Sequence, residues 1–249
     1  MDGLRYCVLI PHFNHHEQLA RFFPDVAALG LPVMVVDDGS DTDSFAAIQE
    51  LQNQYPELML ERLEKNRGKG AAVILGLKQA REYGFTHVIQ IDADGQHNAA
   101  DIIKMKAASE STPDAMISGL PLFGDDIPKA RLHGRKLSLF WVRVETLSTE
   151  IKDAMCGFRV YPVDAMLTAC DAWLFSLRMQ FDLEVLVRWI WSGRRIVFVE
   201  SDVQYPAAGK SHFRMVRDNV HITLMHIKLV LGMLLRSPVL LFRKLARNG

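Results

Sequence analysis

Short segments rich in β-branched residues alternate with longer helical segments, and this alternation constrains the fold of the chain most strongly. Strands are expected at 6–10, 32–36, 59–63, 87–91, 115–118 and 196–200. Helices are expected at 16–29, 43–54, 70–83, 100–109, 136–149, 164–172 and 182–192. Strands and helices in alternation are typical of a parallel sheet covered by helices on both faces. The pattern therefore predicts an α/β fold.

The boundaries of these elements carry their own signals. Asp43 and Asn98 are expected to cap helices, because their side chains can accept hydrogen bonds from backbone donors. Residues 120–135 contain Pro, Gly and mixed charge and are expected to form a loop. The chain has 249 residues and no recognisable linker. We therefore expect one domain at 1–215 and a C-terminal helical extension at 216–249.

The C-terminal extension combines apolar and basic residues. Its charge-free apolar run, 229–235, is bounded by Lys228 and Arg236, and it is shorter than the roughly 20 residues that a membrane-spanning helix needs. Pro238 is expected to end or kink the helix. The composition favours a helix at a membrane surface with cations near anionic headgroups. Packing on the domain or in a homo-oligomer interface remains an alternative.

Charge and cysteine content limit the function classes. Lys and Arg together number 29, as do Asp and Glu, so bulk charge gives no reason to expect a nucleic-acid partner. The three cysteines lack metal-binding spacing, and Cys7 falls in an apolar run where a buried thiol is expected. This favours a reducing compartment. The N-terminus lacks a basic-then-apolar signal sequence, so we expect a cytoplasmic protein.

The acidic sequence Asp92-Ala93-Asp94-Gly95-Gln96 directly follows an expected strand. Ligands of open α/β sheets bind at the carboxyl ends of strands, and Mg²⁺ or Mn²⁺ prefers oxygen ligands of this kind. Asp94 could bind such an ion, with Gln96 adding a carbonyl oxygen. Asp92 could hold sugar or ribose hydroxyls, or assist the metal through water.

Two further motifs occupy similar positions. Asp37 and Asp38 precede Gly39 at a strand end, where their carboxylates could hydrogen-bond a base or ribose; an ordinary Asp-Gly turn is the alternative. Lys69 precedes a helix in the sequence Asn-Arg-Gly-Lys-Gly, where it could attract a phosphate. A basic group follows at Arg131, Arg135 and Lys136, which could bind an acceptor phosphate or membrane headgroups, or could lie on a solvated face.

Together and in order, these motifs resemble family 2 glycosyltransferases of the GT-A fold. The similarity covers about residues 5 to 215 and begins with Ile10-Pro11 and Asn14. It continues through an Asp153…Gly-Phe-Arg signature, the acidic stretch at 181–184, and the sequence Gly-Lys-Ser-His-Phe-Arg, which contains Ser211 and Arg214. The later features resemble the polyprenyl-phosphate mannosyltransferase and glucosyltransferase branch, with His212 where that branch has Lys.

The resemblance implies a GT-A sheet, a nucleotide held near Pro11 and Asp38, and a divalent ion at Asp94 and Gln96. It also implies inverting transfer of a sugar from a nucleotide donor, with Asp153 near the acceptor and Arg214 in a loop over the donor diphosphate. A lipid phosphate acceptor is already anionic at neutral pH and would need Asp153 only for positioning. A hydroxyl acceptor would need a carboxylate base.

The sequence leaves three alternatives to a lipid-linked acceptor. A glycosyltransferase for another hydroxyl acceptor would keep the same motifs. A nucleotidyltransferase shares this type of sheet, but the chain lacks a Gly-rich loop with Arg after the first strand. A non-catalytic nucleotide-sugar sensor would not need Asp92, Asp94 and Asp153 together. We therefore expect a cytoplasmic enzyme at the inner face of the cytoplasmic membrane.

Overall fold

One seven-stranded sheet organises the molecule. The computed structural model describes residues 3–123, 129–172, 175–203 and 215–248. The strand order is β3-β2-β1-β4-β6-β5-β7. The strands are β1 Tyr6–His12, β2 Val33–Asp37, β3 Met59–Arg62, β4 His87–Gln90, β5 Met116–Phe123, β6 Arg159–Pro162 and β7 Ile196–Val203.

The predicted parallel sheet is in fact mixed. β1, β2, β3 and β4 run parallel to one another, but β6 is antiparallel to both β4 and β5. The sequence analysis missed β6 because its four residues include Arg159 and form no apolar run. Arg159 is nevertheless completely buried, and its Nη1 donates to the Asp182 carbonyl oxygen at 2.7 Å. This bond satisfies a charged group that burial would otherwise destabilise.

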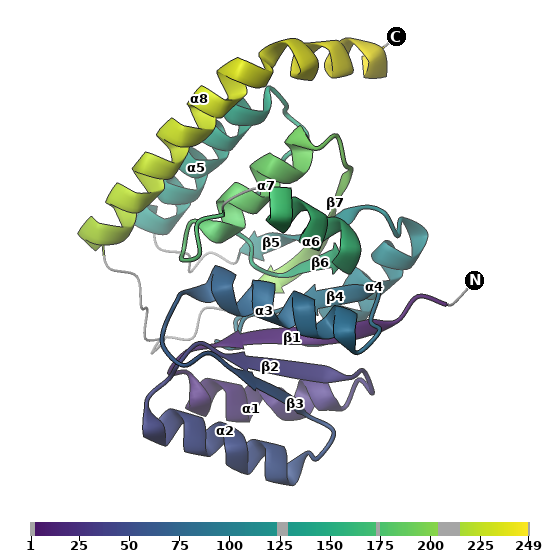
Figure 1. Cartoon of the computed structure of the whole chain (residues 1–249), viewed down its shortest axis with the longest axis vertical. Helices are drawn as coiled ribbons and strands as arrows, with labels where there is room; N and C mark the ends of the chain where they lie inside the picture. Colours follow the sequence, from purple (N-terminus) through teal and green to yellow (C-terminus); the bar gives the residue numbers. More distant parts are fainter. Residues whose placement is uncertain (1–2, 124–128, 173–174, 204–214, 249) are drawn as a thin grey trace.

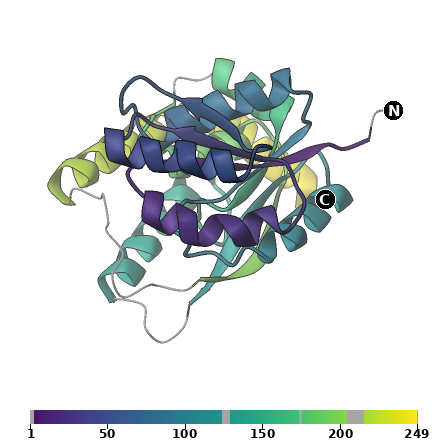
Figure 2. The ribbon, with the colours of Figure 1, turned by 90° about the horizontal axis from the view of Figure 1, so that it is seen from below.

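Helices cover both faces of the sheet (Figure 1). They are α1 His16–Ala27, α2 Thr42–Gln54, α3 Lys69–Glu82, α4 Asp101–Ser111, α5 Lys129–Thr146, α6 Val163–Ala172, α7 Phe181–Trp191 and α8 Met215–Asn248. The buried apolar side chains form two clusters, one for each face of the sheet. Figure 1 shows α1 and α2 at the lower end of the molecule, and Figure 2, which looks from below, shows them side by side in front. Such burial is the main source of stability.

Three local expectations need correction. Residues 120–123 belong to β5 and α5 begins at Lys129, so the expected loop at 120–135 is largely regular structure. The cap of α2 is Asp41, which accepts from the Ser44 amide at 2.8 Å, rather than Asp43. Asn98 is not the N-cap of α4, which is Ala100; the Asn98 Oδ1 accepts from the Ala100 amide at 3.0 Å in the turn before the helix. Cys7 is buried, as expected.

Helix α8 packs against α5 and α7 (Figure 1). Between residues 218 and 246, where its side chains are described, α8 buries the apolar residues Met225, Leu229, Met233 and Leu240. Pro238 lies inside the helix and does not end it, although Figure 1 shows α8 changing direction toward its C-terminal end. Within the described residues, 218–246 is one helix long and apolar enough to cross a membrane by length and composition.

The sheet topology brings the sequence motifs to one edge. β1 lies between β2 and β4 and is parallel to both. Asp38 follows β2 and Asp92 follows β4, so both lie beyond the carboxyl ends of parallel strands. This is the edge at which open α/β sheets bind ligands.

Candidate active site

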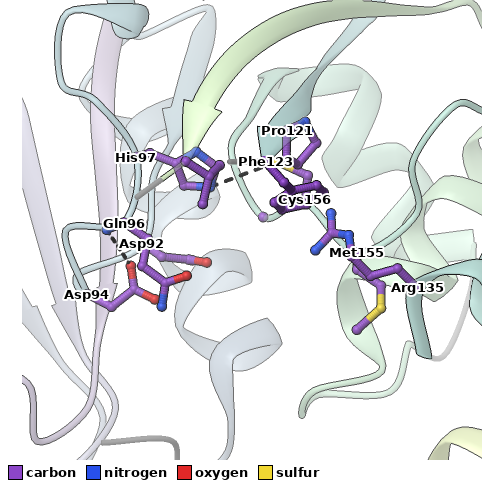
Figure 3. A pocket seen from close by; sticks show the side chains of 11 residues that line it. Asp92, Asp94, Gln96, His97, Pro121, Phe123, Arg135, Met155 and Cys156 are labelled. Carbon is purple, nitrogen blue, oxygen red and sulfur yellow. Dashed lines mark hydrogen bonds between the residues drawn. The ribbon is translucent and has the colours of Figure 1, made fainter. Parts of the chain in front are cut away.

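A small polar cavity lies where the loop after β4 meets the segments around α5 and β6. Its volume is about 80 Å³. Asp92, Asp94 and Gln96 lie on one side in Figure 3, and Arg135, Met155 and Cys156 lie on the other. His97, Pro121, Phe123, Gly157 and Val203 complete the lining. The cavity therefore joins residues that are more than 50 positions apart in the sequence.

The Asp94 turn presents oxygen atoms to this cavity. Gly95 adopts a left-handed conformation with φ of 68°, and the Gln96 amide donates to Asp94 Oδ1 at 3.0 Å. Two carboxylates and an amide oxygen suit a hard cation that completes its coordination with water and phosphate oxygens. The described residues contain no group of three or more His, Cys, Asp and Glu side chains arranged for a metal. The oxygen donors of Asp92, Asp94 and Gln96 are nonetheless of the chemical kind that Mg²⁺ or Mn²⁺ prefers.

Lys69 lies behind Asp92 rather than in the cavity lining. Its Nζ is 2.6 Å from Asp92 Oδ1 and 2.8 Å from Asp182 Oδ2, and its side chain is 19% exposed. Burial alone would lower the pKa of Lys69, but Asp182 and Asp92 raise it above its ordinary value. For Asp92 the effects are reversed: burial would raise the pKa of this carboxyl, but Lys69 lowers it below its ordinary value. The lysine expected to meet phosphate therefore acts on the site through Asp92.

Gly157 makes room for this ion pair. A Cβ at position 157 would collide with Lys69 Nζ and Asp92 Oδ2. The Gly157 carbonyl oxygen accepts from Gln90 Nε2 at 2.6 Å, which fixes the β6 side of the cavity against β4. Glycine in the Gly-Phe-Arg sequence thus leaves room for the Lys69–Asp92 pair, and a larger residue would displace the ends of these two side chains.

Asp153 and Arg135 form the opposite pair. Arg135 Nη2 donates to Asp153 Oδ2 at 2.7 Å, and both side chains are largely buried. Asp153 Oδ1 accepts from the Met155 and Cys156 amides at 3.0 and 2.8 Å. Arg135 lines the cavity, whereas Asp153 supports the lining from behind. Of the basic group noted in the sequence, Arg135 is the member whose described side chain reaches the cavity.

The two carboxylates after β2 are engaged by the protein. Asp37 is completely buried beside His12 and Arg62, at 3.1 and 3.3 Å. Asp38 accepts from the Arg67 and Gly68 amides at 2.7 Å each. Burial raises the pKa of Asp38 despite these amides, which lower it. Neither carboxylate lines the cavity at Asp94; β1 separates the two sites on the same edge.

The remaining expected residues fall into two groups. Pro11 is buried in β1. Asn14 adopts a left-handed φ of 52°, and its Oδ1 accepts from the Asp41 amide at 3.0 Å. Asn14 therefore joins the loop after β1 to the loop after β2. Ser211 and Arg214 lie outside the described residues, and the Arg131 side chain is also outside them.

His97 directly follows the acidic motif, so the sequence allowed it to line a sugar pocket or to make a structural hydrogen bond, but it gave no sign that Phe123, Met155 and Cys156 would lie at the cavity. His97, Phe123, Met155 and Cys156 line it, and Cys156 Sγ lies 3.9 Å from His97 Nε2. Burial raises the pKa of Cys156 to about 12, so its thiol stays protonated at neutral pH. The pairing of β5 with β6 carries Cys156 and Phe123 toward one another, and no local sequence signal encodes that pairing.

Comparison with known proteins matches this architecture to a protein family. The family described as "Glycosyl transferase family 2" matches residues 7–167. A dolichol-phosphate mannosyltransferase from Pyrococcus furiosus is 30% identical over 62% of this chain and 45% of its own length. A polyprenol monophosphomannose synthase from Mycolicibacterium smegmatis is 29% identical over 63% of this chain and 61% of its own length. The matches span about half of these relatives.

Solved structures share the fold at low sequence identity. Glucosyl-3-phosphoglycerate synthase from Mycobacterium tuberculosis, solved with Mn²⁺ and uridine-diphosphate-glucose, has a TM-score of 0.68 at 13% identity. The similarity covers 93% of this chain and 79% of that one. TarS 1–349 from S. aureus, in complex with UDP-GlcNAc, has a TM-score of 0.61 at 18% identity, covering 92% and 67%. These similarities establish the predicted GT-A type of fold.

Proposed function

Because this chain belongs to glycosyl transferase family 2, we propose that it transfers a sugar from a nucleotide-diphosphate sugar to a polyprenyl phosphate or another lipid-linked acceptor. Two relatives support this acceptor class by their names, a dolichol-phosphate mannosyltransferase and a polyprenol monophosphomannose synthase. The proposed reaction inverts the configuration of the anomeric carbon. The acceptor oxygen forms a bond to the anomeric carbon while the bond between that carbon and the donor diphosphate breaks. The leaving group is a nucleoside diphosphate.

One observation carries this proposal. The Asp92-Ala93-Asp94-Gly95-Gln96 turn and the Arg135–Asp153 pair face each other across one cavity at the carboxyl edge of the sheet. An acidic wall suits a metal-bound diphosphate, and a cationic wall suits an anionic acceptor. Transfer requires both substrates at adjacent positions.

Asp94 and Gln96 are the proposed ligands of Mg²⁺ or Mn²⁺. When bound, the ion would neutralise the charge that develops on the leaving diphosphate. Asp92 is already paired with Lys69, which supports a role toward sugar or ribose hydroxyls rather than as the main ligand. Asp37, Asp38, Pro11 and Asn14 would shape the nucleotide side, while Ser211 and Arg214 remain proposed for the diphosphate.

Asp153 is proposed as a positioning residue. Its three hydrogen bonds, from Arg135 and two amides, are directed to both carboxylate oxygens. Arg135 would then be held ready to bind the acceptor phosphate, the role that the sequence suggested for the basic group Arg131, Arg135 and Lys136. An acceptor phosphate carries its nucleophilic oxygen as an anion at neutral pH, so no proton has to be removed.

A donor panel tests the proposed function. Purified chain would be mixed with nucleotide sugars, Mn²⁺ or Mg²⁺ and a membrane lipid extract, and released nucleoside diphosphate would be measured. We expect release that needs metal, extract and Asp94, with Asp94→Asn at least about a hundredfold slower because several kcal/mol of transition-state stabilisation are lost. Asp43→Asn, at an exposed position in α2, is the matched control.

Two outcomes would contradict the proposal. Release that is independent of metal and unchanged in Asp94→Asn would exclude the proposed site. Pyrophosphate in place of nucleoside diphosphate would indicate nucleotidyl transfer.

The proposal also includes the organisation and location of the protein. We propose a catalytic domain at 1–215 and a helical extension at 216–249. We also propose a location at the inner face of the cytoplasmic membrane.

A further inference from the structure

Arg159 lies beneath the cavity rather than in its lining. It is the first residue of β6, and it pairs in register with Gln90 of β4 and Ser118 of β5. Its side chain is completely buried. A cation is rarely buried in this way, because removing a charge from water is unfavourable unless its hydrogen-bond donors find partners. The partners of Arg159 therefore indicate what this position provides.

On one side, Arg159 is connected to residues 92–96, the acidic wall of the cavity. Its Nη1 donates to the Asp182 carbonyl oxygen at 2.7 Å and lies 4.0 Å from Asp182 Oδ1. The other carboxylate oxygen of Asp182 is 2.8 Å from Lys69 Nζ, which in turn is 2.6 Å from Asp92 Oδ1. Positive and negative side chains therefore alternate from Arg159 to the edge of the cavity.

On the other side, Arg159 supports residues 154–157, which line the opposite side of the cavity with three of their side chains or backbones. Its Nη2 donates to the Ala154 carbonyl oxygen at 3.4 Å. Gln90, its neighbour on β4, donates from Nε2 to the Gly157 carbonyl oxygen at 2.6 Å. Two buried side chains therefore hold both ends of this segment from beneath.

The segment that Arg159 supports also holds the cationic wall of the cavity. The Met155 and Cys156 amides donate to Asp153 Oδ1 at 3.0 and 2.8 Å. Asp153 Oδ2 accepts in turn from Arg135 Nη2 at 2.7 Å. Arg135 and the acidic wall lie on opposite sides of the cavity in Figure 3. A shift of the segment would therefore move Arg135 relative to the acidic wall.

The shape of the guanidinium suits this bridging position. Its planar fork directs Nη1 to the Asp182 carbonyl oxygen and Nη2 to the Ala154 carbonyl oxygen at the same time. A lysine ammonium is a single point on a flexible stem and cannot keep both contacts at this separation. Each wall also has hydrogen bonds of its own, such as the bond from the Gln96 amide to Asp94 Oδ1. Loss of the fork should therefore change the spacing of the walls and leave each wall intact.

We propose that Arg159 is a positioning residue that holds the acidic wall and residues 154–157 at a fixed separation. This inference rests on the proposed function, in which the donor diphosphate binds at the acidic wall and the acceptor phosphate binds Arg135. Transfer requires the acceptor oxygen and the anomeric carbon at reacting distance, and a misplacement of about 1 Å lowers such a rate by about a hundredfold. Arg159 touches neither substrate and acts through the spacing of their two sites.

The variant Arg159→Lys tests the inference by separating binding from transfer. With the donor panel, metal and lipid extract described above, we expect kcat to fall at least about tenfold. The KM for the donor, and Mn²⁺-dependent donor binding measured by calorimetry, should change by less than about threefold, because the acidic wall is intact. Arg188→Lys is the matched control. Arg188 is 4% exposed and pairs with Glu184 outside the cavity lining, so this variant should melt at a lower temperature and keep its kcat.

The reactivity of Cys156 gives a second readout, which does not depend on activity. Its thiol is 3% exposed and belongs to the segment that Arg159 supports, so it should react slowly with iodoacetamide in the folded wild type. In Arg159→Lys its alkylation, located by peptide mass spectrometry, should be at least about tenfold faster, because local opening of the segment exposes the thiol. Cys170, which lies outside the segment and is partly exposed, should react at the same rate in wild type and Arg159→Lys.

Three results would overturn the inference: a kcat equal to that of the wild type, donor binding that weakens as much as kcat falls, or Cys156 alkylation that is unchanged. If Arg159→Lys does not fold, Arg159→Gln, which removes the buried charge, replaces it with the same expectations. Wild-type chain that transfers no sugar, together with faster Cys156 alkylation in Arg159→Lys, would overturn the proposed function alone.

Discussion

At the scale of single residues, Lys69 shows how a buried charge organises the site. Its ammonium lies between Asp92 after β4 and Asp182 on α7. Each carboxylate would be unfavourable in this position without a cation. The lysine thus fixes Asp92, the first residue of the Asp-X-Asp motif. Asp94, the second, lines the cavity and accepts a hydrogen bond from the Gln96 amide. One side chain separates the roles of two nearby aspartates.

Replacing Lys69 by Met tests how strongly the stability of the protein depends on the ion pairs of Lys69 with Asp92 and Asp182. Asp92 and Asp182 would keep their burial and lose their common partner, so we expect the free energy of unfolding to fall by about 3–5 kcal/mol. Urea denaturation monitored by circular dichroism measures the change. Lys78→Met, at an exposed position of the same helix, should change stability by less than about 0.5 kcal/mol. Equal stability of the two variants would contradict the assignment.

At the scale of elements, α7 connects the site to the C-terminal helix. All of its residues from Phe181 to Trp191 are buried. Asp182 meets Lys69 near the cavity, and two residues later Glu184 accepts from Arg188 Nε at 2.8 Å and pairs with Lys228 of α8. One buried helix therefore carries charge partners both for Lys69 beside the cavity and for Lys228 of α8.

The Glu184 contacts predict a pH-dependent stability. Burial would raise the pKa of Glu184, but the Ser176 amide and Arg188 lower it below its ordinary value of 4.5. A lowered carboxyl pKa gives stability that is present above pH 4.5 and is lost as pH falls through the folded-state pKa. Glu184→Gln should therefore be less stable by about 3 kcal/mol at pH 7.

The difference between wild type and Glu184→Gln should shrink as pH falls below 4.5. Thermal unfolding followed from pH 7 downward measures it. Glu82→Gln, at an exposed position, should show no such convergence. A constant difference across this range would mean that Glu184 acts through packing rather than through its charge.

At the scale of the whole molecule, one side of α8 packs on the domain and the other side is exposed. Leu229 is completely buried, whereas Leu235 on the same helix is 84% exposed. The buried side completes the apolar cluster that includes Trp189 and Trp191. The chain can therefore present an apolar surface without unfolding any part of its core.

Matched alanine substitutions test this division of α8. Leu229→Ala should lower the free energy of unfolding by about 2–5 kcal/mol, because it leaves a cavity in packed surroundings. Leu235→Ala should change it by less than about 0.5 kcal/mol. Chemical denaturation of both variants in the absence of lipid gives the comparison. Similar small effects for both would show that α8 is not docked on α5 and α7 in solution.

The sequence by itself determined the alternation of strands and helices, the acidic and glycine motifs at strand ends, and the family resemblance. These features are local: backbone propensity and side-chain periodicity act over a few residues. The expected helix boundaries at 16–29 and 43–54 accordingly lie within two residues of α1 and α2. The Asp94 turn was identifiable for the same reason, since its oxygen donors are adjacent in the chain.

Only the tertiary structure decided which distant groups pair. The antiparallel pairing of β6 with β4 and β5 brings Gly157 against the Lys69–Asp92 pair. The start of α5 at Lys129, which the Pro and Gly residues concealed, places Arg135 beside Asp153. The sequence suggested that Lys69 could attract a phosphate, whereas in the structure its ammonium pairs with Asp92 and Asp182. Burial of an unpaired charge is unfavourable, which explains these two ion pairs. Long-range pairing depends on the sum of many contacts, and no short segment encodes it.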